Sequence, residues 1–167
     1  IRHYTASIEK LKKVVNSRPG EEIFGMTMIN SKGKTILVAD TNVQDFPSAE
    51  RLVKVSKSCV RVARLFGFDP KVAFLSHSTF GKPVSKNTQH VRDAIQLLKN
   101  EKVDFDFDGE MQPDVALNPI YQEVYPFSKI VGKANILIMP ALHSAAISTK
   151  LMREFGGAKL IGPLLIG

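Results

Sequence analysis

The sequence has little sulfur chemistry and no long apolar stretch. It contains one cysteine, Cys59, and no tryptophan among 167 residues. A lone thiol cannot form a disulfide within the chain, so we expect a cytoplasmic protein. No apolar run approaches the roughly 18 residues of a membrane span, and no basic-then-apolar signal opens the chain. Since the chain begins with Ile1 and stops on the apolar stretch Leu160–Gly167, we expect a piece of a longer protein.

Charge is unbalanced but not clustered. The net charge is +7, yet lysine and arginine are scattered along the chain without a long run. A basic balance can indicate nucleic acid, anionic lipid or phosphorylated small molecules as partners. The scatter favours a solvated basic surface, and we expect neither a nucleic-acid nor a membrane partner.

Several catalytic and metal-binding patterns are missing. The chain has no G-x-S-x-G elbow and no G-x-G-x-x-G fingerprint, which argues against a hydrolase triad and against a Rossmann dinucleotide site. The four histidines, His3, His77, His90 and His143, do not pair at metal-ligand spacing, and Cys59 has no second thiol. We therefore expect no metal site. His77 and His143 are interpreted as polar lining residues rather than general bases.

What is present is an alternation of strand-like and helix-like segments. This pattern predicts one α/β domain over residues 1–167, with three layers and a mostly parallel sheet. The expected helices are His3–Asn16, Pro47–Phe66, Thr88–Lys102 and Leu142–Phe155, and the expected strands are Ile23–Ile29, Thr35–Ala39, Lys71–Leu75, Phe105–Phe107, Asn135–Met139 and Lys159–Leu165. Ser31–Lys34 is expected to be a hairpin turn, with Gly33 free to take positive φ.

Three loops are expected where strands end and helices begin, at Ser76–Lys86, Asp108–Asp114 and Pro140–Ala146. In open α/β sheets ligands bind at this carboxyl edge. The first loop offers hydroxyls, a glycine and a lysine before a helix, which can hold an anion. Its glycine spacing is not that of a Walker motif, and a plain polar turn is the alternative. Its candidate ligand-binding residues are Ser76, Ser78, Thr79, Gly81 and Lys82.

The second loop is rich in acids. Nearby carboxylates can divide acid and base roles or hold a divalent cation. A solvated turn in which Asp114 caps a helix is the alternative interpretation. Apolar neighbours such as Phe105 and Phe107 favour a partly buried site, where charge needs a partner. The candidates here are Asp108, Glu110, Gln112 and Asp114.

From Gly67 onward the sequence resembles the phosphate acetyl/butyryltransferase family. The order and spacing of the matching segments make the resemblance specific, and Asp40–Val43 is also similar to the family. The segments are Lys71–Gly81, Asp108–Leu117, Tyr125–Ser128, Gly132–Pro140 and Gly156–Gly167. Within the family, Met111 and Tyr125–Ser128 resemble the transferase-like module at the C-terminus of bacterial NADP-dependent malic enzymes.

The resemblance implies an isocitrate/isopropylmalate dehydrogenase-like fold and the inserted domain of a two-domain transferase. The family's catalytic Ser-Arg pair and following Asp would lie beyond Gly167, so no catalytic residue is assigned here and we expect no turnover by this chain alone. It implies that Ser128 joins the cleft wall, that CoA or acetyl-CoA is the ligand of the complete module, and that the family forms homo-oligomers of at least two copies. In a malic enzyme, NADP and Mg²⁺ or Mn²⁺ would belong to the other module, which decarboxylates malate to pyruvate.

The sequence departs from the family after Pro140. Active enzymes tend to carry Asp-Leu-Glu-Ala-Gly-Asn there, whereas this chain has Ala141–Ala146, which keeps the helix pattern and loses the polar groups. Three functions stay open: a regulatory domain that binds acetyl-CoA, an active acyltransferase moving an acyl group between CoA and phosphate, and an assembly module with Pro47–Phe66 as a plausible contact.

Overall fold

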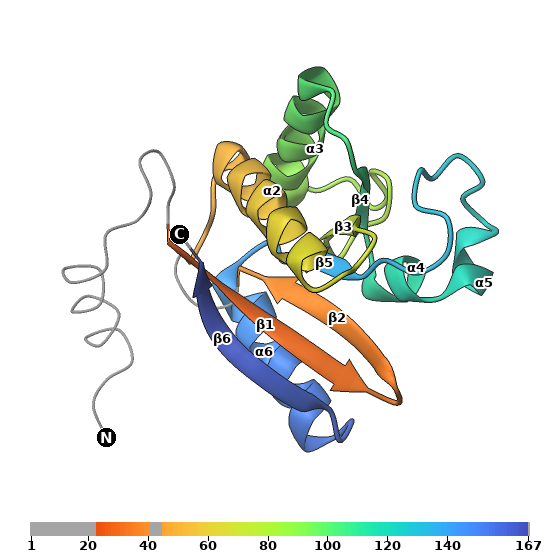
Figure 1. Cartoon of the computed structure of the whole chain (residues 1–167). Coiled ribbons are helices and arrows are strands. Elements are labelled where there is room, and N and C mark those ends of the chain that lie inside the picture. Colours follow the sequence, from red (N-terminus) through yellow and green to blue (C-terminus); the bar gives the residue numbers. More distant parts are fainter. Residues whose placement is uncertain (1–22, 41–44, 167) are drawn as a thin grey trace.

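Figure 1 shows the computed structural model of the chain, which describes residues 23–40 and 45–166. The helix expected over His3–Asn16 lies outside these residues, as do Thr41–Val43 of the family-like segment. No helix in the described part of the chain is long and apolar enough to cross a membrane.

Six strands of the described residues form one sheet, in the order β4-β3-β5-β2-β1-β6. The pairs β2–β5, β5–β3 and β3–β4 are parallel, and β1 is antiparallel to both of its neighbours. The mostly parallel sheet predicted from the sequence is therefore confirmed. The strands are β1 (Phe24–Ser31), β2 (Lys34–Ala39), β3 (Lys71–Leu75), β4 (Asp106–Met111), β5 (Ile136–Ile138) and β6 (Lys159–Ile166).

The hairpin between β1 and β2 is also confirmed. Ser31 pairs with Lys34, and the two residues between them, Lys32 and Gly33, have φ of 51° and 73°. Positive φ at both central positions gives the turn a twist that matches the strands.

Helices cover both faces of the sheet, as Figure 1 shows with α2 and α3 on one side and α6 on the other. Successive side chains of a strand point to opposite faces. Accordingly Val72 and Phe74 pack with α2 and α3, whereas Ala73 and Leu75 pack with α4 and α6. These three layers are the predicted architecture. The helices are α2 (Ala49–Leu65), α3 (Gln89–Glu101), α4 (Pro113–Leu117), α5 (Pro119–Gln122) and α6 (Leu142–Glu154), with a short 3-10 turn at Lys86–Thr88.

Helix α2 begins at a side-chain cap. Ser48 Oγ accepts a hydrogen bond from Arg51 N, which satisfies a main-chain donor of the first turn. We had expected Pro47 in the first turn of the helix. It lies before the helix instead, because Ser48 is the cap. The apolar stripe Leu52, Val55 and Cys59 is buried against the sheet.

The prediction of a loop over Asp108–Asp114 is wrong. Strand β4 continues to Met111, with Ala73 paired to Asp108 and Leu75 to Met111. Helix α4 starts two residues later, at Pro113. Asp108 and Glu110 remain in a strand because their carboxylates accept hydrogen bonds from neighbouring segments.

Candidate functional site

The carboxyl ends of β3 and β4 hold most of the predicted site residues. The loop after β3 is joined to β4 by main-chain hydrogen bonds from Ser76 N to Met111 O (2.9 Å) and from Phe80 N to Glu110 O (2.8 Å). These bonds bring Ser76–Lys82 and Glu110–Gln112 together, as expected for one edge of a parallel sheet.

Glu110 lies at the centre of this arrangement and is only 1% exposed. Its Oε1 accepts hydrogen bonds from Ser78 Oγ (2.9 Å) and Gly81 N (2.8 Å). Arg92 of α3 places Nη1 3.5 Å from the same oxygen. A buried carboxylate needs such partners, and here they hold the loop after β3 in a single shape.

Arg92 ties the next segment into the same network. Its guanidinium donates to Thr88 Oγ1 (2.7 Å) through Nη1 and to Ser85 O (2.9 Å) through Nη2. Glu110 and Arg92 together therefore hold the loop at Ser78–Gly81 and the turn at Ser85–Thr88, which follow one another between β3 and α3. Arg92 was not among the sequence candidates, because its partners lie on three different elements.

Thr79 and Gln112 join the two sides of the site. Gln112 N donates to Thr79 Oγ1 (3.1 Å), and Gln112 Nε2 donates to His77 O (2.7 Å). These two bonds join the loop after β3 to the residue that follows β4.

Asp108 and Ser128 form hydrogen bonds with the main chain at Lys129 and Ile130. Asp108 Oδ2 accepts from Lys129 N (2.8 Å), and Oδ1 accepts from Gly109 N (2.9 Å). Ser128 Oγ accepts from Ile130 N (3.4 Å). These contacts fasten the chain around Lys129 to β4.

A cavity of about 190 Å³ opens beside the loops. Exposed Lys82 has no ion-pair or hydrogen-bond partner for its amine among the described residues. Sequence reasoning missed the apolar side of the cavity, although Tyr125 lies in the family-like segment. Four predicted residues, Thr79, Lys82, Gln112 and Asp114, line the cavity together with Val115, Tyr121, Val124 and Tyr125.

Aromatic contacts support this apolar side. The ring centroids of Phe80 and Tyr125 are 5.3 Å apart, and those of Phe80 and Phe127 are 4.9 Å apart. Such tilted and edge-on pairs are favourable arrangements of aromatic rings. They hold the segment after α5 against the loop after β3.

The third expected loop, Pro140–Ala146, is mostly helix, because α6 begins at Leu142. A His90 ring nitrogen lies 3.0 Å from Pro140 O, and the rings of Phe46 and His143 are 5.6 Å apart. Nearby, at the end of β2, buried Asp40 accepts from Gly25 N and from Arg51 Nη2, both at 2.9 Å.

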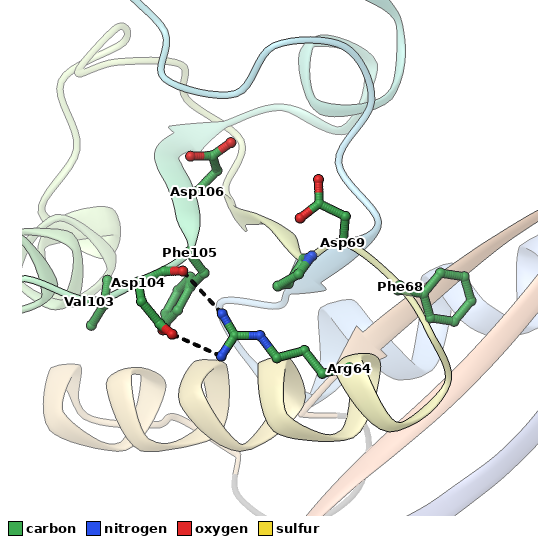
Figure 2. Close-up of a pocket in the computed structure, with 8 residues that line it drawn as sticks. Arg64, Phe68, Asp69, Val103, Asp104, Phe105 and Asp106 are labelled. Carbon is green, nitrogen blue, oxygen red and sulfur yellow. Dashed lines mark hydrogen bonds and ion pairs between the residues drawn. The ribbon is translucent and has the colours of Figure 1, made fainter.

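A larger cavity, of about 420 Å³, lies at the opposite edge, where β3 and β4 begin. Figure 2 shows Arg64 bound to the carboxylate and the carbonyl of Asp104, with the carboxylates of Asp69 and Asp106 nearby. Within the part of the chain that the structure describes, no group of three or more His, Cys, Asp or Glu residues is arranged to hold a metal ion.

Comparison with known proteins shows the family and agrees with the fold. The family model described as phosphate acetyl/butaryl transferase matches residues 1–167. The chain belongs to the phosphate acetyl/butyryltransferase family. It is 43% identical, over 166 residues, to an NADP-dependent malic enzyme of Rhizobium meliloti (strain 1021). It is also 40% identical, over 135 residues, to a phosphate acetyltransferase of Treponema pallidum (strain Nichols).

The family's solved structures confirm the fold expected from the resemblance. A phosphotransacetylase from Streptococcus pyogenes superposes with a TM-score of 0.90 at 29% identity, over 99% of this chain and 52% of that one. The Rhizobium match covers 99% of this chain and 22% of the malic enzyme, and the Treponema match covers 78% and 40%. The chain therefore spans about half of the solved transferase and about a fifth of the malic enzyme.

Proposed function

We propose that this chain is part of the transferase-like module of a cytoplasmic NADP-dependent malic enzyme. The module binds acetyl-CoA at the carboxyl edge of the sheet and contributes to a homo-oligomer, through which binding changes malic enzyme activity. The cavity beside Lys82 is the observation that carries the proposal. It combines an unpaired cation, polar groups already held in place and an apolar side within one small opening.

The division of labour among the polar residues supports binding. The Lys82 ammonium is exposed and suits a phosphate of CoA, whereas Tyr121 and Val124 offer apolar surface to the rest of the ligand. Buried Ser78 and Oε1 of Glu110 are engaged in holding the loop. They therefore position the loop that carries Lys82.

The start of α6 favours binding over turnover. Buried Ala141 precedes the helix, and His143 is in contact with the ring of Phe46. No acidic side chain is present in the first turn of α6. The residues of this chain thus supply a wall for a ligand and no acid at this helix start.

NADP and a divalent metal do not fit the described residues. They contain no grouping of acids and histidines suited to a metal ion, and the sequence has no dinucleotide fingerprint. In the proposed protein these groups act on malate in the other module, and no step of their chemistry passes through this chain.

Calorimetry with acetyl-CoA on the full-length parent tests the proposal. We expect saturable binding, weakened about five- to tenfold by Lys82→Ala, because one exposed charge-assisted contact contributes about 1–1.4 kcal/mol. Lys99→Ala removes another exposed lysine, on α3 and outside the cavity lining, and should leave the affinity unchanged. Absence of acetyl-CoA binding to the parent would rule out the regulatory function.

A working acyltransferase is the second candidate. The 40% identity to a phosphate acetyltransferase favours it. In that case the same cavity would receive the substrate, and the parent would release free thiol from acetyl-CoA in the presence of phosphate. Thiol release no faster than the uncatalysed rate would exclude this function while leaving the binding function intact.

A further inference from the structure

The amino edge of the sheet carries a group of lysines. Lys34 is the first residue of β2, Lys71 is the first residue of β3, and Lys133 shortly precedes β5. Because β2, β5 and β3 are parallel neighbours, these three lysines lie along one edge of the sheet. It is the edge opposite the cavity beside Lys82.

The side chains of Lys34 and Lys133 meet. In the register of β2 and β5 Leu37 pairs with Ile136, and continuing this register toward the amino edge places Lys34 beside Lys133. Contact with the Lys34 side chain, together with its positive charge, lowers the pKa of Lys133 below its usual range. Like charges held this close repel each other, and an anion between them offsets the repulsion.

Lys71 brings a third positive charge to the turn before β5. Its Nζ donates to Val131 O at 2.6 Å and lies 3.9 Å from the position that a Cβ would take at Gly132. Asp69, close by in sequence, lines the neighbouring cavity together with Arg64. Among the described residues, none of the three lysines has an ion-pair partner.

The turn over residues 131–133 has main-chain donors to spare. Its carbonyls are engaged, since Val131 O accepts from Lys71 and Gly132 O accepts from Gln122 Nε2. The N–H groups of Val131, Gly132 and Lys133, in contrast, have no acceptor within the part of the chain that the structure describes. Gly132 has a φ of 83°. Successive N–H groups in a turn of this kind can converge on one anion.

We propose that the turn over residues 131–133, together with Lys34, Lys71 and Lys133, binds a phosphate group of a small anion. Such a group needs positive charge to compensate its own and donors already held in place for its oxygens, and this turn supplies both. A phosphate group suits the turn better than a carboxylate, because its three strong acceptor oxygens match several donors at once. The site lies apart from the cavity beside Lys82, so either site can exist without the other.

Amide-resolved nuclear magnetic resonance of the 167-residue chain, titrated with pyrophosphate, is the first test. We expect saturable shifts of the Val131, Gly132 and Lys133 amides. Lys34→Ala should weaken the binding about five- to tenfold, because one charge-assisted contact is lost. Lys86→Ala removes an exposed lysine from the segment that leads from β3 to α3, and should leave the affinity unchanged.

Other outcomes of the titration would overturn the proposal. Shifts centred on Lys82 and its cavity, or an affinity that Lys34→Ala leaves unchanged, would place the anion elsewhere. Tighter binding of a polyglutamate peptide than of pyrophosphate would indicate an acidic protein segment as the partner. Inorganic phosphate and glycerol phosphate, titrated in parallel, distinguish a free ion from a phosphate ester as the preferred ligand.

Lysine acetylation of the full-length parent is the second test and reports on the complete protein. We expect acetic anhydride to modify Lys34 and Lys133, and pyrophosphate at nine-tenths occupancy of the site to slow both modifications about tenfold. Lys86 should react at one rate throughout. If Lys34 and Lys133 are unreactive without pyrophosphate, another part of the parent covers the turn and the proposal is wrong. Calorimetry with acetyl-CoA, read independently, still decides the ligand-binding function.

Discussion

Removing the carboxylate of Glu110 should destabilise the protein by about 2–3 kcal/mol. The substitution Glu110→Ala takes the acceptor from Ser78 Oγ, Gly81 N and Arg92 Nη1. Ser78 is completely buried, so its hydroxyl gains no water and keeps only Ser76 Oγ, 3.2 Å away, as a side-chain partner. Arg92 is 26% exposed and Gly81 is half-buried, so both are partly rehydrated. Weakened pairing of these groups costs about 1–2 kcal/mol in total, and the one deleted buried methylene adds about 0.8 kcal/mol.

Urea unfolding followed by circular dichroism measures this loss. Glu110→Gln keeps the shape and the acceptor oxygen but removes the charge, and should cost about 1–2 kcal/mol. Glu123→Gln changes an exposed carboxylate and should stay within about 0.5 kcal/mol of the parent. If Glu110→Ala costs less than about 1 kcal/mol, the buried network does not hold the loop and the account of the site is wrong.

Two further perturbations test the packing. Gly109→Ala should destabilise by about 1–3 kcal/mol in the same urea assay, because its Cβ would lie 2.6 Å from Phe74 O at a φ of +144°; a neutral result would contradict this close approach. Burial raises the pKa of the Cys59 thiol above its ordinary 9.0. The folded state keeps the neutral thiol, so stability should be constant below pH 9 and fall by about 1.4 kcal/mol by pH 10 relative to a Cys59→Ala variant; equal pH profiles would contradict it.

The fold was accessible from the sequence where local pattern and tertiary structure agree. The turn Ser31–Lys34 contains Gly33, which takes the positive φ that a twisted hairpin needs. Along α2 the buried apolar residues recur at helical spacing. Strand β4 was cut short because its acids look like loop residues. The partners that keep Glu110 in a strand lie 29 and 32 residues away, at Gly81 and Ser78, beyond the reach of local reasoning.

The candidate site shows the same limit. Topology correctly predicted that Thr79, Lys82, Gln112 and Asp114 would meet at one sheet edge, where they line a common cavity. It did not reveal that Ser78 and Glu110 are buried and bonded to each other. The sequence did not predict a role for Arg92 in the site, because a lysine or arginine on an amphipathic helix is normally solvated. Which of the ten candidates touch a ligand remains a prediction.

The buried pair Asp40–Arg51 has a mechanical consequence. Arg51 Nη2 donates both to Asp40 and to Ile23 O, and Asp40 also accepts from Gly25 N. The point at which the chain enters β1 is thus clamped to the tip of β2 and the first turn of α2. Displacement of the backbone at Ile23 would therefore disturb the Arg51 guanidinium and, through it, the first turn of α2.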